Sequence, residues 1–198
     1  MNKEEITKLI ERQRAYFESG ATKPLEARLE ALRTLRALVV TYEEDILSAL
    51  KEDLGKSATE AIMTELGMVK ASLGYMLKHL PSLAKREYVR TPLAQFPARS
   101  YKVAVPYGVV LVMSPWNYPV LLSLDPLIEA VAAGNTVILK PSAYAGATSA
   151  LLEKLIGQYF EPEYIAVVTG GREENTALLE AHFDKIFFTG SQAVGKEV

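Results

Sequence analysis

Residues 108–113 read GVVLVM, and this apolar run decides the fold because similar runs follow it along the chain. They are TVILK at 136–140, YIAVVT at 164–169 and KIFFTG at 185–190. Runs that are apolar without alternation are typical of strands buried on both faces of a parallel sheet. The sequence therefore predicts four strands of one parallel sheet.

Helix-like segments separate these strands. They cover residues 120–133, closed by Gly134, then 147–159 and 173–181. Alternation of strand and helix is the signature of a doubly wound α/β domain. We expect a Rossmann-like parallel sheet with helices on both faces.

The first 80 residues are expected to be helical. Leucines and other apolar residues recur at helical spacing between Leu25 and Leu50, which predicts one long amphipathic helix with Pro24 at its first position and Gly55 as its stop. A second helix is predicted from Ser57, which has capping-box spacing to Glu60, to Pro81.

Residues 85–105 contain two short alternating segments around Pro92 and Pro97, which predicts an extended β-hairpin; a proline-punctuated linker is the alternative. The chain accordingly divides into an N-terminal helical part (1–84), a hairpin (85–106) and a Rossmann-like dinucleotide-binding part (107–198).

Composition excludes several classes of function. The chain has 22 Lys and Arg against 24 Asp and Glu, and no basic block suggests a nucleic-acid partner. No apolar run approaches the roughly 18 residues of a membrane helix, and the N-terminus lacks a signal-peptide core, so a cytoplasmic protein is expected. There is no cysteine, and His79 and His182 lie far apart without carboxylates at metal spacing, so we expect no metal site.

The unusual motifs all follow predicted strands, where ligands bind in doubly wound sheets. In FFTGSQAVG a buried strand leads into Gly190, Ser191 and Gly195, and a glycine-rich helix start attracts phosphate. Glycines that serve only packing are the alternative, and the spacing departs from G-x-G-x-x-G.

Lys140 closes a strand directly before Pro141 and could reach ribose hydroxyls together with Ser142, although a solvated strand end is the simpler interpretation. The Asn117 amide could donate to a developing oxyanion, beside the rigid surface of Trp116. The alternative is a tryptophan that covers the sheet core and an asparagine that satisfies its own turn.

Four motifs, taken in chain order, resemble the aldehyde dehydrogenase superfamily, and their spacing most resembles its class 3, or fatty and aromatic aldehyde, branch. They are PWNYP (115–119), AAGNTVILKPS (132–142), VVTGG (167–171) and FDKIFFTGSQAVGK (183–196). The resemblance covers essentially the whole chain.

The resemblance implies a role for each matching residue. Asn117 would be the oxyanion-hole asparagine, Ser114 and Trp116 would line the cofactor path, and Lys140 with Ser142 would hold the adenosine ribose of NAD or NADP. The phosphate-binding turn would comprise Gly190, Ser191, Gln192, Ala193, Val194 and Gly195. Family members oxidise a small-molecule aldehyde to an acid with a cysteine nucleophile and a glutamate base, and commonly pair as dimers through such a hairpin.

The sequence departs from the family pattern at two points. Ala143 stands where many relatives have a glutamate after KPS, so we expect tolerance of NADP. The chain also ends at VGKEV, before the family's catalytic glutamate and cysteine, which suggests a truncated cofactor-binding portion with an incomplete sheet and no catalytic domain.

Two other interpretations stay open. Acyl-phosphate reductases share the fold, although PWNYP argues against them. A non-catalytic module could instead bind nucleotide, or bind a partner through the hairpin and the open sheet edge.

We predict that the purified 198-residue chain is inactive by itself, because without a thiol it cannot form the covalent adduct of the family reaction. Spectrophotometric assays with aldehyde and NAD or NADP should show no production of NADH or NADPH. Turnover above that of a no-protein control would contradict this.

Overall fold

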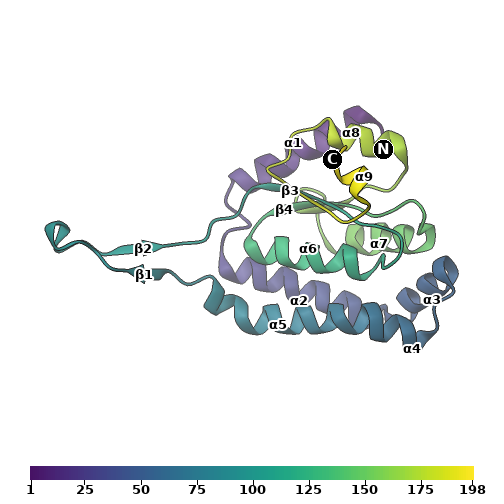
Figure 1. Ribbon diagram of the computed structural model, residues 1–198, viewed down its shortest axis with the longest axis horizontal. Helices are drawn as coiled ribbons and strands as arrows, with labels where there is room; N and C mark the ends of the chain where they lie inside the picture. Colours follow the sequence, from purple (N-terminus) through teal and green to yellow (C-terminus); the bar gives the residue numbers. More distant parts are fainter.

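The computed structural model describes residues 1–198, and its centre is the predicted parallel sheet (Figure 1). The strands are β3 (Val109–Met113), β4 (Thr136–Lys140), β5 (Ile165–Val167) and β6 (Lys185–Phe188), in the spatial order β5-β4-β3-β6. Every neighbouring pair is parallel. The predicted α/β class with a Rossmann-like sheet is thus confirmed.

The strand order reverses at β3. The chain builds β3, β4 and β5 outward in one direction, and then returns to place β6 on the other side of β3. In register, Met113 at the end of β3 pairs with Lys140 of β4 and with Phe188 of β6. The carboxyl ends of these three strands therefore meet at a switch point, where open α/β sheets bind ligands.

Strand β6 differs from the prediction that all four strands are buried. Its residues alternate between exposed and half-buried, and the Phe187 side chain is 40% exposed. The prediction was wrong here because β6 is an edge strand on which no helix packs closely, whereas the other edge strand, β5, is covered by α7 and is mostly buried. Strands β3 and β4 have a strand on each side and are buried throughout.

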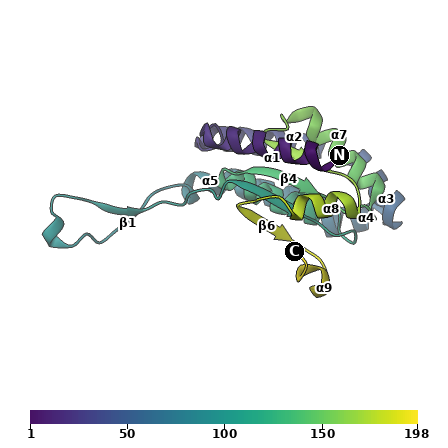
Figure 2. The same ribbon diagram turned by 90° about the horizontal axis from the view of Figure 1, so that it is seen from above.

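Helices cover both faces of the sheet, as predicted (Figures 1 and 2). On one face lie α6 (Leu121–Ala133) and α7 (Gly146–Tyr159), and on the other α1 (Lys3–Glu18) and α8 (Arg172–Leu179). A cluster of 28 buried residues fills the first side and a cluster of 10 fills the second. The short helix α9 (Gln192–Gly195) follows β6.

The N-terminal region is helical, but the predicted long helix is two helices. Helix α2 (Leu25–Thr41) ends and α3 (Glu43–Leu54) begins at Tyr42, whose φ of −104° and ψ of 26° leave the helical region. The β-branched run at 39–41 weakens the helix before this point. The acidic residues at 43–45 then favour a new helix N-terminus. Gly55 ends α3, as predicted, and its backbone there is left-handed.

The second predicted helix begins as expected, since the Ser57 hydroxyl accepts a hydrogen bond from Glu60 N at 3.2 Å. It comprises α4 (Ala58–Ala61), the π-helical turn η1 (Ile62–Leu66) and α5 (Gly67–Leu83). The prediction that Pro81 ends it was wrong. Proline lies inside the last turn, which still closes through the bond from Ala84 N to Leu80 O at 2.9 Å.

The predicted hairpin projects from the body of the molecule (Figures 1 and 2). It contains β1 (Glu87–Val89), the short 3-10 turn η2 (Leu93–Gln95) and β2 (Ser100–Lys102). The two strands pair antiparallel, with Tyr88 opposite Tyr101. Leu93 and Phe96 at the tip are almost fully exposed, so this arm presents apolar surface to its surroundings.

No helix of the structure combines the length and the apolar character needed to cross a bilayer. The acidic, histidine and cysteine side chains also form no group of three or more that could hold a metal ion.

Tyr164 makes a testable contribution to stability. Burial, with the neighbouring Tyr16, raises the pKa of this phenol, and its hydroxyl has no hydrogen-bond partner. A raised folded-state pKa gives stability that is fully present below the unfolded pKa of about 10 and is lost as the pH rises above it. We predict that Tyr164→Phe removes part of this alkaline loss and raises the free energy of unfolding at pH 7 by about 1 kcal/mol.

Urea unfolding from pH 7 to pH 11 measures both effects. Tyr144→Phe is the matched control, because the Tyr144 side chain is 87% exposed and the substitution should change neither quantity. Equal alkaline slopes for the parent chain and Tyr164→Phe would contradict the prediction.

Candidate functional site

A cavity of about 580 Å³ opens at the carboxyl edge of the sheet, at the switch point beside β3. Its walls come from the segments that follow all four parallel strands and from helix α8. Among the residues that line it are Ser114 and Trp116 after β3, Lys140, Ser142 and Ala143 at β4, Gly170, Gly171, Arg172 and Asn175 after β5, and Gly190, Ser191 and Val194 after β6.

The segment after β3 contributes one buried and one exposed side chain. The Ser114 hydroxyl lies 2.6 Å from the Ser123 hydroxyl of α6, and both are buried. Trp116 is 53% exposed and forms part of the cavity wall. The tryptophan therefore does not cover the sheet core, which was the simpler interpretation from sequence.

Lys140 is buried, with only 3% of its surface accessible, so the interpretation of a solvated strand end was wrong. Its Nζ donates to Gly170 O at 2.8 Å and to Pro141 O at 2.9 Å. Burial lowers the pKa of this ammonium, and the charge of Glu174 partly opposes that shift. Two of the three ammonium donors are thus used within the chain, beside the cavity.

The Gly170–Gly171 segment forms the wall beside Lys140. Gly170 has a φ of +126°, and a Cβ at this position would collide with the Glu174 side chain. The Glu174 carboxylate accepts from Gly171 N at 2.7 Å. Hydrogen bonds from the Glu174 and Gly171 backbones hold the pKa of that carboxyl below its usual range. Only the TGG motif pointed to this segment from sequence.

The glycine turn after β6 enters the site only in part. Gly190, Ser191 and Val194 line the cavity, whereas Gln192, Ala193 and Gly195 do not. Ser191 caps α9 by accepting from Val194 N at 3.3 Å. A Cβ on Gly190 would collide with the Phe188 ring. Packing is therefore one reason for glycine at this position.

Asn117 lies outside the cavity lining and is exposed, and its side chain makes no hydrogen bond within the chain. The interpretation that this amide satisfies its own turn was therefore wrong. The backbone carbonyl oxygen of Asn117, in contrast, accepts a hydrogen bond from Lys56 Nζ at 3.0 Å. The structure brings Ser114, Trp116, Lys140 and Ser142 to one cavity and places Asn117 on the adjoining bend.

Sequence reasoning missed two residues that contact this bend. Lys56 lies in the segment before α4, and Glu65 lies in η1. Lys56 pairs with Glu65 at 2.6 Å. A lysine nine residues before a glutamate within a helical region carries no local signal, so only the folded structure reveals the pair.

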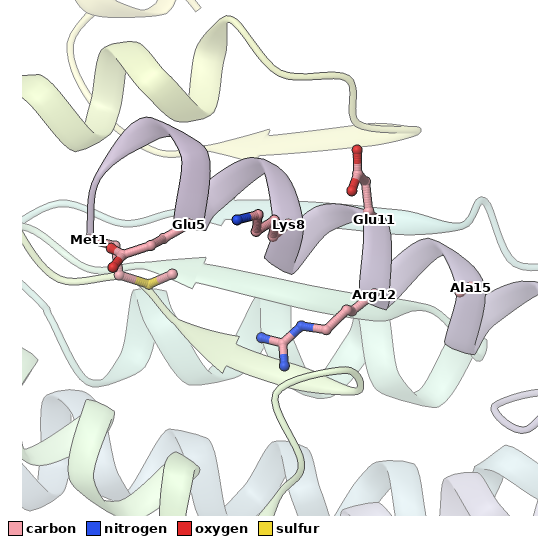
Figure 3. Close-up of a pocket in the computed structure, with 6 residues that line it drawn as sticks. All are labelled: Met1, Glu5, Lys8, Glu11, Arg12 and Ala15. Atoms are coloured by element: carbon pink, nitrogen blue, oxygen red, sulfur yellow. The ribbon is translucent and has the colours of Figure 1, made fainter.

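A larger hollow of about 810 Å³ lies on the outer face of α1 (Figure 3). All six residues that line it belong to the N-terminus and this one helix, and the Lys8, Glu11 and Arg12 side chains point in different directions. Ligand sites bring polar groups together from several elements, so the cavity at the sheet edge is the candidate site.

Comparison with known proteins agrees with this geometry. The model of the family described as "Aldehyde dehydrogenase family" matches residues 1–198. The chain is 43% identical over 194 residues to aldehyde dehydrogenase family 3 member H1 from Arabidopsis thaliana, covering 98% of this chain and 40% of that protein. It is 44% identical over 185 residues to 4,4′-diaponeurosporen-aldehyde dehydrogenase from Staphylococcus aureus, covering 93% and 40% respectively.

Solved structures give the same result. A substrate-bound Staphylococcus aureus AldH superposes with a TM-score of 0.94 at 42% identity, over 97% of this chain and 42% of that one. At the level of fold alone, an NADP complex of glyceraldehyde-3-phosphate dehydrogenase from Methanocaldococcus jannaschii has a TM-score of 0.80 at 20% identity, over 100% and 43% of the two chains. The chain spans about 40% of the length of the curated relatives that it matches.

Two glycine substitutions, one in the cavity wall and one inside α7, should have opposite effects on the free energy of unfolding. Gly170→Ala should lower the free energy of unfolding by about 1–3 kcal/mol, because φ is positive and the new Cβ meets Glu174. Gly157→Ala should raise it by about 0.5–1 kcal/mol, because Gly157 lies inside α7 and an added Cβ has no neighbour within 4 Å. Denaturant titration of both variants provides the measurement, and unchanged or increased stability of Gly170→Ala would show that the wall at Gly170 imposes no special constraint.

Proposed function

This chain belongs to the aldehyde dehydrogenase family, and on that premise we propose that it supplies the cofactor-binding portion of an NAD(P)-dependent enzyme that oxidises an aldehyde to a carboxylic acid. The observation that carries the proposal is the cavity at the switch point of the sheet, where the sequence motifs of four strand ends meet. NAD or NADP bound there would accept a hydride from the aldehyde carbon.

The cavity fits a nucleotide in size and in chemistry. Its volume of about 580 Å³ lies within the usual range of roughly 300–1,000 Å³ for cofactor sites. Lys140 provides the most specific group. An ammonium has three donors, and two of them bind the carbonyls of Pro141 and Gly170, which leaves one for a ribose hydroxyl. Ser142 adds a hydroxyl at the same wall.

The remaining predicted contacts divide between the two neighbouring strand ends. Ser114 and Trp116 would flank the cofactor where it leaves the end of β3. Gly190, Ser191 and Val194 would lie against the phosphates. Gln192, Ala193 and Gly195 line no part of the cavity, so we assign them the support of this turn rather than contact.

Asn117 is the group that we assign to the chemical step. Its amide N–H would donate to the oxygen of the aldehyde as negative charge develops there. The amide is free to do so because it has no partner within the chain. The nucleophile is not part of this assignment, because these 198 residues include no cysteine.

We extend the proposal to association through the hairpin. The arm projects from the body and carries exposed apolar side chains, among them Tyr88, Leu93 and Phe96. Apolar surface of this kind is typical of a protein contact. A homodimer formed through this arm is the arrangement that we favour.

Cofactor selectivity follows from the wall beside Lys140. Ala143 places no carboxylate there, and Arg172 lines the same cavity. Two cations, Lys140 and Arg172, and one carboxylate side chain, Glu197, line the cavity, so a 2′-phosphate would meet more positive than negative side-chain charge there. We propose that the site accepts NADP as well as NAD.

Calorimetric titration of the 198-residue chain with each cofactor tests both proposals. NADP should bind within about tenfold of NAD, and Ala143→Glu should weaken NADP binding by about tenfold, equivalent to about 1.4 kcal/mol, by adding like charge. Ala150→Glu is the matched control, because Ala150 is exposed on α7 and lines no part of the cavity. Strong selectivity for NAD would refute the NADP assignment, and binding of neither cofactor would refute the function.

A further inference from the structure

Lys56 and Glu65 form a buried ion pair that the proposed chemistry does not use. Their side chains are only 9% and 0% exposed, and the two charged atoms lie 2.6 Å apart. In every other ion pair of the chain both side chains are at least 20% exposed. Removing two charges from water is costly, so such a pair needs further hydrogen bonds.

The additional contacts of both charges all lie in the five residues that follow Trp116. Glu65 Oε2 accepts from Val120 N at 2.8 Å and from Leu121 N at 3.1 Å. Lys56 Nζ donates to Asn117 O at 3.0 Å and lies 4.1 Å from the centre of the Tyr118 ring. The pair thus joins the bend that contains Asn117 to the start of α6.

This bend has few other means of support. Pro115 and Pro119 have no backbone N–H, and the three residues between them are exposed. Helix α6 receives no cap from the side chain of Val120, its own N-cap residue. Glu65 therefore caps α6 from another helix, and Lys56 makes the one side-chain hydrogen bond to the backbone of residues 116–118.

We propose that Lys56 and Glu65 are positioning residues that fix the direction in which Asn117 presents its amide. The proposal rests on the proposed function, in which Asn117 donates to the developing oxyanion. An oxyanion donor contributes only when it is held in place before the reaction. Neither residue lines the cavity, so the pair would meet this requirement from outside it.

The decisive variant is Lys56→Met combined with Glu65→Gln. It removes both charges together, so no unpaired charge stays buried, and exchange of a buried pair for uncharged groups is often tolerated. The amide that Glu65→Gln introduces keeps an oxygen that can accept from Val120 N. The variant loses the bond to Asn117 O, which is the contact under test.

Trp116 reports on the bend directly, because it is the only tryptophan of the chain and adjoins Asn117. In the folded double variant we expect faster local motion in time-resolved fluorescence anisotropy. Acrylamide quenching should rise by up to about twofold, since the exposed fraction can increase from 53% to complete exposure. Circular dichroism and urea unfolding establish that the variant is folded.

Lys70 and Glu43 provide the control pair. They also lie 2.6 Å apart, but they are about one-third exposed and join α5 to α3, away from the bend. The Lys70→Met/Glu43→Gln variant should leave the Trp116 signals unchanged. Equal signals in the parent chain and the Lys56/Glu65 double variant would overturn the proposal.

Lys56→Gln combined with Glu65→Gln provides the same test if the first double variant does not fold. It also leaves no unpaired charge buried, and the amide introduced at position 56 is one atom shorter than lysine, so the bond to Asn117 O is lost. These measurements need neither cofactor nor aldehyde. Failure of the positioning proposal is therefore distinguishable from failure of the proposed function, which the cofactor titrations test separately.

Discussion

The rest of the structure depends on the parallel pairing of β3 with both β4 and β6. Parallel strands cannot be joined by tight turns, so each connection must cross over the sheet, and each crossover here contains a helix. Helices on both faces leave only the strand ends open to ligands. Polar groups at the strand ends are therefore collected at one edge of the sheet, where Lys140, Ser114 and Ser191 line the same cavity.

Burial on two faces also explains the composition of the central strand. Val110 and Val112 contribute to the larger core, while Val109, Leu111 and Met113 contribute to the smaller one. Each side chain of this size stabilises the fold by roughly 1.5–3 kcal/mol when it is removed from water. A polar residue at any of these positions would face one core or the other, so the run has no alternation.

The elements that sequence predicted correctly are those fixed by local patterns, such as the apolar runs of β3 and β4, the Ser57 cap and the hairpin. The helix boundaries near Tyr42 and Pro81 departed from prediction by small amounts, because the β-branched run before Tyr42 is a weak local signal and a last helical turn tolerates proline. The exposure of β6 departed from prediction because it depends on neighbours that a local pattern does not contain. The same reason applies to the site. The burial of Lys140 requires Gly170, 30 residues later, and the contacts of Glu65 lie 55 and 56 residues away. The motifs could be identified from the sequence, whereas the distant residues that hold them in place could be identified only from the folded structure.

The π-helical turn η1 changes the direction in which side chains point along the continuous helical segment formed by α4, η1 and α5. A π turn holds one more residue than an α turn, so everything after it is rotated by about 100° about the helix axis relative to an uninterrupted α-helix. Within the π turn, Glu65 faces the start of α6, and after the turn Val69 and Leu73 face the core. Gly67 allows the widening, since a Cβ there would lie 2.6 Å from Ile62 O. One extra residue in this turn thus lets a single helical segment direct a charge toward the bend after β3 and an apolar stripe toward the interior.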